Sequence, residues 1–234
     1  MKGGNRSLAT RWSMLDDLDG RNAEESWRWF IDRYRSYIRT CLHRLIRSSE
    51  LAEQANDDVW SYLFTSSMIE NADRNRRFRA YLAGTVRNFA LGWLRKHQAS
   101  EQVALIEAGS SKLDPSRQYE QQEMQLWTRQ VVQLALSELS KVNVDQARAL
   151  RWFYGLPTTV GEACGEPRSA SWIAQQLATS GNAVHQLLFR ARSRLQFCIE
   201  NELRETVHDA AQLDDERRLV YAVIAVESPG LEPE

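Results

Sequence analysis

The stretch SGNAVHQLLFRARSRL, residues 180–195, decides the predicted fold of this chain. Ser180 is a favourable N-cap, and apolar residues follow it with the spacing of one helical face. The apolar positions are Val184, Leu187, Leu188, Ala191 and Leu195. A helix that starts at Ser180 and buries this stripe leaves its polar side chains exposed.

A shorter apolar pattern precedes this helix. Trp172, Ile173 and Leu177 form the stripe of a short helix, and residues 178–179 are enough for the turn between the two helices. Such a pair is typical of a helix-turn-helix, whose second helix lies in the major groove of DNA. The alternative is an ordinary amphipathic hairpin with solvated arginines, because the pattern is degenerate.

The polar face of residues 180–195 carries side chains suited to DNA. Asn, Gln and Arg pair in a bidentate manner with base edges in the major groove. Arg192 and Arg194 are better suited to phosphates. The base-reading candidates are Asn182, His185, Gln186 and Arg190.

A second cationic segment lies at residues 74–96, which contain arginines, a lysine and aromatic rings but no acid. Cations neutralise phosphates and rings accept unstacked bases, so this composition suits an opened DNA strand. Phe78, Phe89 and Trp93 also lie on the apolar stripe of a helix, and we expect them in the core. The position of Tyr81 is left open.

The remaining pattern predicts an all-α protein. The chain has 234 residues, of which 43% are hydrophobic, and this length favours two small domains. Separate helices are expected at residues 8–18, from about residue 24, after a cap at residues 48–49, and from about residue 76 to residue 97. Residues 98–113 lack periodicity and predict a flexible tether, after which Asp114 and Pro115 start a new helix. The predicted division is a first domain at 1–97, a linker at 98–113, a second domain at 114–204 and a C-terminal extension at 205–234.

Composition excludes several classes of protein. The net charge is −1, so any nucleic-acid surface must be local. Cys41, Cys164 and Cys198 lie far apart without a CxxC pair, and we expect reduced apolar fillers, no metal and no cofactor. The chain has no HExxH, P-loop or GxSxG motif, so we do not expect an enzyme. It has neither an apolar run of about 18 residues nor a signal-peptide core, so we expect no membrane association and a cytoplasmic protein.

Three segments resemble, in order, one known family, the extracytoplasmic-function (ECF) sigma factors. Residues 52–64 (AEQANDDVWSYLF) are similar to the polymerase-binding helix of the family's region two. Residues 78–96 (FRAYLAGTVRNFALGWLRK) resemble the helix that engages the minus-ten promoter element. Residues 173–195 (IAQQLATSGNAVHQLLFRARSRL) resemble the region-four helix-turn-helix. The resemblance covers residues 8–204, and its opening TRWSMLDDL (10–18) is similar to that of some planctomycete-type members.

This resemblance implies a bacterial sigma factor that binds core RNA polymerase, recognises the minus-ten and minus-thirty-five elements and promotes DNA melting. Residues 71–77 would capture a base flipped from the non-template strand, read by Asn75 or Asn71. The implied polymerase contacts are Glu53, Gln54, Asp57 and Asp58. The implied minus-ten contacts are Asn71, Arg74, Asn75, Arg76, Arg77, Arg79, Arg87 and Asn88. The implied minus-thirty-five contacts are Ser180, Asn182, His185, Gln186, Phe189, Arg190 and Arg192.

The chain departs from the family pattern in three places. Leu187 stands where the family often has a basic residue and Thr179 where an apolar turn residue is usual, so we expect weak minus-thirty-five affinity. The loop at residues 157–168 is longer than the usual link, and it is either inert or in contact with polymerase or DNA. The acidic tail at 205–234 contains an apolar run, 219–226. It either packs on a domain and competes with DNA or polymerase, in place of or beside an anti-sigma factor, or is a partly ordered extension.

Two other functions remain as alternatives. One is a helix-turn-helix regulator that binds DNA without polymerase. The other is a degenerate sigma factor that acts as an interaction protein and binds core polymerase without starting transcription.

Overall fold

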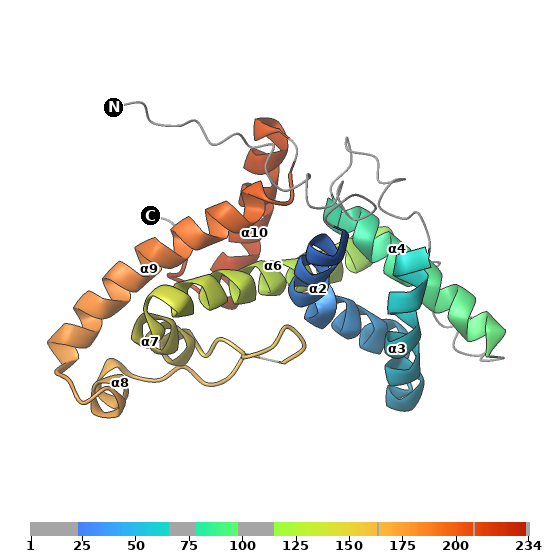
Figure 1. Ribbon diagram of the computed structural model, residues 1–234. Helices are drawn as coiled ribbons and strands as arrows, with labels where there is room; N and C mark the ends of the chain where they lie inside the picture. The colour runs from blue at the N-terminus through green and yellow to red at the C-terminus, as the bar shows by residue number, and fades with distance from the viewer. Residues whose placement is uncertain (1–22, 66–77, 98–114, 163, 208, 233–234) are drawn as a thin grey trace. The chain divides into compact units, whose positions relative to one another are not determined.

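The computed structural model of this chain describes residues 23–65, 78–97, 115–162, 164–207 and 209–232. Their regular structure is helical and includes no strand, which confirms the all-α prediction (Figure 1). No described helix is long and apolar enough to cross a bilayer. The predicted helix at 8–18 lies outside the described residues. The helices are α2 (Ala23–Leu45), α3 (Ser49–Thr65), α4 (Phe78–Lys96), α6 (Pro115–Val142), α7 (Val144–Tyr154), α8 (Ala170–Gln176), α9 (Gly181–Arg204) and α10 (Ala210–Glu227).

The chain forms two compact units whose bounds differ from the predicted domains. Unit 1 comprises residues 1–123 and 205–212, and unit 2 comprises residues 124–204 and 213–234. The boundary falls inside α6, and most of the C-terminal extension belongs to unit 2.

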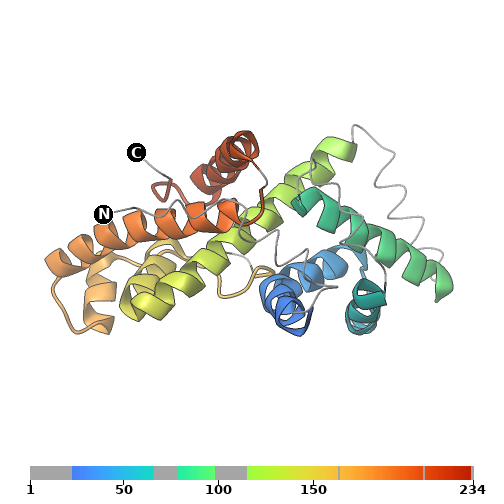
Figure 2. The same ribbon diagram turned by 45° about the horizontal axis from the view of Figure 1, so that its top comes forward.

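Unit 1 is built on α2, α3 and α4, which pack against one another in pairs (Figure 2). Phe78, in the first turn of α4, is 1% exposed and contacts two rings of α2. Its ring centroid lies 6.5 Å from that of Phe30 and 5.5 Å from that of Tyr34. Phe89 and Trp93 are buried further along α4, so the predicted core role of all three α4 rings is confirmed.

Unit 2 contains α7, α8 and α9, with α9 packed against both of the others. Asn143 caps α7, and its Oδ1 accepts from the Gln146 backbone N–H at 2.9 Å. The Asn143 N–H donates to Leu139 O at 2.8 Å, so the Gln146 side chain does not complete a capping box. Gly155 ends α7 with a φ of 62°, and a Cβ there would lie 2.1 Å from Gly165 O, so this position requires glycine.

The C-terminal extension from residue 213 packs on unit 2. In α10 the buried side chains include Leu213, Val220 and Ile224. Glu227 accepts two hydrogen bonds from Arg129 of α6, at 3.1 and 2.9 Å. Beyond α10, Leu231 is 1% exposed. The extension is therefore part of the core of unit 2.

The cysteines differ in environment. None is in a disulfide, Cys41 is buried, and burial raises the pKa of its thiol to about 12. This agrees with an apolar filler. Cys164 is exposed in the loop after α7, which corrects the expectation that all three cysteines fill the core.

Candidate nucleic-acid interface

The helix predicted from residues 180–195 forms and is capped as expected. Ser180 precedes α9, and its Oγ accepts from the Ala183 backbone N–H at 3.2 Å. Ser169 caps α8 in the same way, accepting from the Trp172 N–H at 3.2 Å. The predicted stripe is buried except at Leu187, which is half-buried; its buried members are Val184, Leu188, Ala191 and Leu195. The two helices therefore form a packed pair with defined starts.

The opposite face of α9 is open. Phe189 on this face is 68% exposed. The other predicted groups on this face are also exposed: Asn182, His185, Gln186 and Arg190. One side of α9 thus presents the amide, imidazole and guanidinium groups that pair with base edges.

The Arg192 side chain, in contrast, is held by contacts with other residues of the chain. Its Nε donates to the Tyr154 hydroxyl at 2.6 Å, and its guanidinium carbon lies 5.6 Å from the ring centroids of Phe153 and Tyr154. The Tyr154 hydroxyl in turn donates to the Gly230 carbonyl at 2.7 Å. Arg192 was predicted on a DNA phosphate, but here it is half-buried and joins α9 to α7 and the C-terminal extension.

Arg79 also differs from its predicted position. It was expected on the strand-binding face of α4, but it is 8% exposed and its Nη1 lies 2.6 Å from Glu123 Oε2. In this arrangement the guanidinium holds the start of α4 to α6 within unit 1. The sequence does not reveal this, because an arginine in a cationic run looks the same whether it faces water or a buried acid.

The rest of α4 keeps polar groups at its surface. Asn88 is exposed and Arg87 is half-buried. Tyr81, whose position the sequence left open, is half-buried, and burial raises the pKa of its hydroxyl. The remaining predicted minus-ten residues, Asn71, Arg74, Asn75, Arg76 and Arg77, lie outside the described residues.

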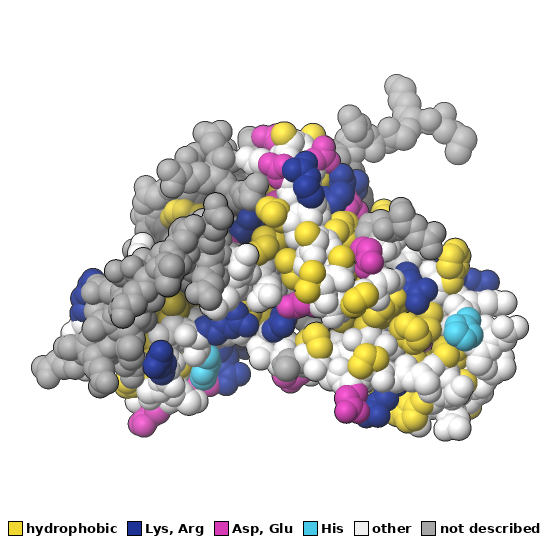
Figure 3. All heavy atoms as spheres, turned by 180° about the vertical axis from the view of Figure 1, so that it is seen from behind, with side chains coloured by type: hydrophobic (Ala, Val, Ile, Leu, Met, Phe, Trp, Pro, Cys, Tyr) yellow, Lys and Arg dark blue, Asp and Glu magenta, His cyan; other side chains and the backbone are white. Residues whose placement is uncertain are grey.

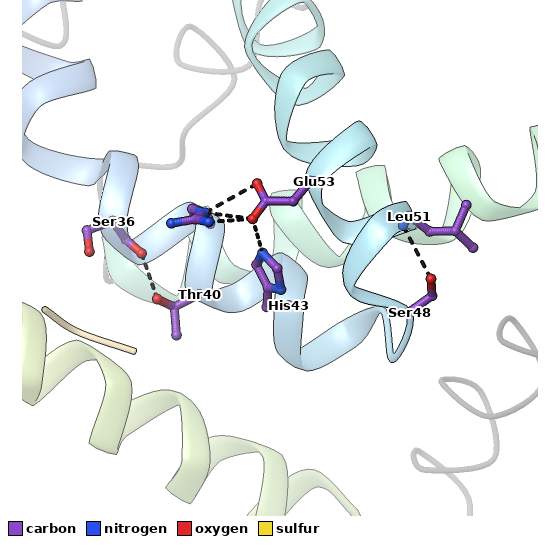
Figure 4. A network of polar contacts seen from close by, with 7 residues as sticks. Ser36, Thr40, His43, Ser48, Leu51 and Glu53 are labelled. Atoms are coloured by element: carbon purple, nitrogen blue, oxygen red, sulfur yellow. Dashed lines mark hydrogen bonds and ion pairs between the residues drawn. The ribbon is translucent and has the colours of Figure 1, made fainter. Parts of the chain in front are cut away.

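The four residues of α3 that are predicted to contact polymerase, three acids and one glutamine, divide into two pairs. Glu53 accepts from the Arg39 guanidinium and contacts His43 Nε2 at 3.0 Å (Figure 4). The hydrogen bond from Arg39 holds the pKa of Glu53 below its ordinary value. Asp58 accepts from the Trp93 indole N–H at 2.7 Å. Glu53 and Asp58 thus make contacts between helices of unit 1, and Asp58 is exposed, as are Gln54 and Asp57.

The surface drawn in Figure 3 carries charges of both signs. On the face shown in Figure 3, basic and acidic side chains are interspersed among apolar and uncharged ones. This agrees with the net charge of −1. A phosphate-binding surface therefore depends on individual cations that no acid of the chain already holds.

Comparison with protein families, with curated proteins and with solved structures finds no match to this chain. The family suggested by the three sequence segments stays a prediction.

Proposed function

We propose that this chain is a promoter-specificity factor of bacterial RNA polymerase, of the ECF sigma type that its segments resemble. One observation carries the proposal: α9 buries one stripe and leaves Asn182, His185, Gln186 and Arg190 exposed on the other. A capped helix with such a face, preceded by a short packed helix, suits insertion into the major groove.

In this proposal α9 recognises the base sequence of the promoter. Asn182 or Gln186 would bind adenine through its amide, and Arg190 would bind guanine through its guanidinium. The cationic residues 74–77, which precede α4 in the sequence, and Arg87 of α4 would hold the melted strand, at a cost of a few kcal/mol of unstacking per flipped base. The polymerase, and not this chain, would make RNA.

The division into two units supports a bipartite factor. Unit 1 contains α4 with the exposed Asn88, and unit 2 contains the α8–α9 pair. Each unit therefore carries one segment suited to one promoter element.

A regulator that binds DNA without polymerase is the second candidate. The contacts of α3 favour it, because Glu53 and Asp58 are already used by Arg39, His43 and Trp93. In this case only α9 and its neighbours would act, and core polymerase would be unnecessary.

Transcription in vitro with purified core polymerase on a promoter library distinguishes the two candidates. We expect promoter-specific starts that require the chain. Gln186→Ala should reduce them by about tenfold, the effect of losing one bidentate base contact. The matched control is Gln125→Ala, which changes an exposed glutamine of α6.

Two results would contradict the proposal. No promoter-specific start with any library member would overturn the sigma assignment. Tight, sequence-specific duplex binding by the free chain, with no effect of core polymerase, would support the second candidate instead.

A further inference from the structure

The loop between α7 and α8 is held in place by hydrogen bonds. The Gly165 N–H donates to Gly155 O at 2.7 Å, and the Arg168 N–H donates to Trp152 O at 2.7 Å. Near its start, Pro157 O accepts from Gln133 Nε2 at 2.7 Å. These bonds fix the position at which the loop enters α8.

The loop also contains a hydrogen-bonded polar turn and a buried side chain. Glu162 accepts from the Thr158 N–H and hydroxyl at 2.9 and 2.8 Å and from the Thr159 N–H at 3.2 Å. These hydrogen bonds, with the Thr158 hydroxyl contributing most, lower the pKa of Glu162. Val160 is 1% exposed. Hydrogen bonds and a buried side chain therefore hold the described residues of the loop in a fixed path between α7 and α8.

The loop ends at a cationic residue, Arg168, which lies just before α8. Arg168 directly precedes the N-cap Ser169, and its guanidinium carbon lies 5.4 Å from the centroid of the Trp172 ring. Trp172 is itself held edge-on by Trp152 of α7, with centroids 5.4 Å apart and an interplanar angle of 87°. Arg168 is exposed, so its planar group is oriented while its N–H donors face solvent.

Most cations of unit 2 already have a polar partner. The committed side chains and their partners are Arg129 with Glu227, Lys141 with Glu138, Arg148 with Asp145, Arg151 with Pro157 O, Arg192 with Tyr154, Arg204 with Asn201, Arg217 with Glu200, and Arg218 with Asp215. The side chains of Arg168, Arg190 and Arg194 make no hydrogen bond or ion pair with any described residue. All three are exposed.

Of the three arginines whose side chains have no polar partner, two lie on α9 and Arg168 directly precedes the N-cap of α8. Arg190 and Arg194 are one turn apart on α9, and Arg168 stands at the start of α8, which packs against α9. In helix-turn-helix complexes the second helix enters the groove while the first crosses the DNA backbone. A cation at the start of the first helix is therefore placed for a phosphate.

We propose that Arg168 binds a DNA phosphate and that the described part of the loop, residues 155–162 and 164–168, is part of the nucleic-acid interface. This inference rests on the DNA-binding function proposed for α9. The stacking on Trp172 orients the guanidinium before DNA arrives, so less side-chain entropy is lost when the phosphate binds. Because no acid must be displaced, Arg168 contributes its full charge to counterion release.

The test measures the salt dependence of binding between the intact purified chain and a mixed-sequence DNA duplex. Each phosphate contact contributes about 0.9 to the slope of log Kobs against log salt concentration. We expect Arg168→Gln to reduce the slope by about this amount, and Arg168→Lys, which keeps the charge, to restore most of it. The matched control is Arg218→Gln, an exposed arginine of α10 held by Asp215, which should leave the slope unchanged.

Arg190→Gln separates the two proposals. If Arg190→Gln reduces the slope and Arg168→Gln does not, the loop inference is overturned while DNA binding by α9 stands. If the wild-type chain shows no salt-dependent binding, or if neither variant changes the slope, phosphate binding by Arg168 and DNA binding by Arg190 in the free chain are both overturned, whereas the sigma assignment is decided separately by the transcription test. Equal melting temperatures of the variants and the wild type exclude misfolding as the cause.

Discussion

Arg79 and Glu123 form a buried ion pair, with Nη1 and Oε2 2.6 Å apart and side chains only 9% and 8% exposed. The pair joins the first turn of α4 to α6 within unit 1. Burying two charges costs hydration, and the mutual attraction offsets this cost only while both partners are present. The contact therefore stabilises the packing of α4 on α6 only when both side chains are present.

Glu123→Ala should destabilise unit 1, because it leaves the buried Arg79 guanidinium without this carboxylate. The expected loss in the free energy of unfolding is about 3–5 kcal/mol, measured by urea denaturation. The double variant Arg79→Met/Glu123→Leu should recover most of the loss. Glu138→Ala, which removes an exposed partner of Lys141, should cost less than about 1 kcal/mol. Equal effects of Glu123→Ala and Glu138→Ala would contradict the structural role.

Tyr154→Phe should loosen the C-terminal extension. The hydroxyl accepts from Arg192 and donates to Gly230 O, so its loss removes two hydrogen bonds at once. We expect a loss of about 1–3 kcal/mol and faster amide exchange near residue 230. Tyr62→Phe, at an exposed tyrosine of α3, is the matched control. Unchanged exchange in the Tyr154 variant would show that these bonds do not hold the extension.

The start of α9, the buried stripe of α9 and the aromatic core of α4 could be predicted from sequence. Each follows from helical periodicity and a serine cap, which are local signals. The pairing of Arg79 with Glu123 could not, because its partners are 44 positions apart and either charge is equally compatible with water. The same is true of Arg192, whose environment depends on Tyr154 and on the backbone carbonyl of Gly230. Polar contacts between residues that are far apart in the chain produce no periodic pattern in the sequence.

Deletion of residues 213–234 tests the two roles considered for the extension. The contacts of the extension on α9 include Gln196, which donates to Leu231 O at 3.4 Å, and Glu200, which accepts from Arg217 at 2.7 Å. The predicted reading residues, near the other end of α9, remain exposed. We therefore expect the deletion to lower the melting temperature of unit 2 without strengthening DNA binding. Stronger DNA binding or higher promoter-dependent transcription by a stably folded deletion variant would support autoinhibition.

The contact between Arg39 and Glu53 predicts a pH-dependent contribution to stability. The pKa of Glu53 is below its ordinary value of 4.5 when the chain is folded, chiefly because Arg39 donates hydrogen bonds to it. The contact therefore stabilises the fold fully above pH 4.5, and this stabilisation is lost as the pH falls through the lower folded pKa. Arg39→Gln should lower the melting temperature at pH 7, and its difference from wild type should shrink in acid. A difference that stays constant down to pH 2 would exclude this linkage.

Thr128→Val should stabilise unit 2. Thr128 of α6 is 2% exposed, and its Oγ1 has no hydrogen-bond partner among the described residues. A buried hydroxyl that makes no hydrogen bond carries the cost of its lost hydration, whereas valine has nearly the same shape and no such cost. We expect a gain of about 1 kcal/mol in the free energy of unfolding, measured by urea denaturation. The control is Thr158→Val, which removes a hydroxyl that donates to Glu162 at 2.8 Å and should be destabilising. A loss of stability in Thr128→Val would mean that this hydroxyl is satisfied in solution, most simply by a buried water molecule.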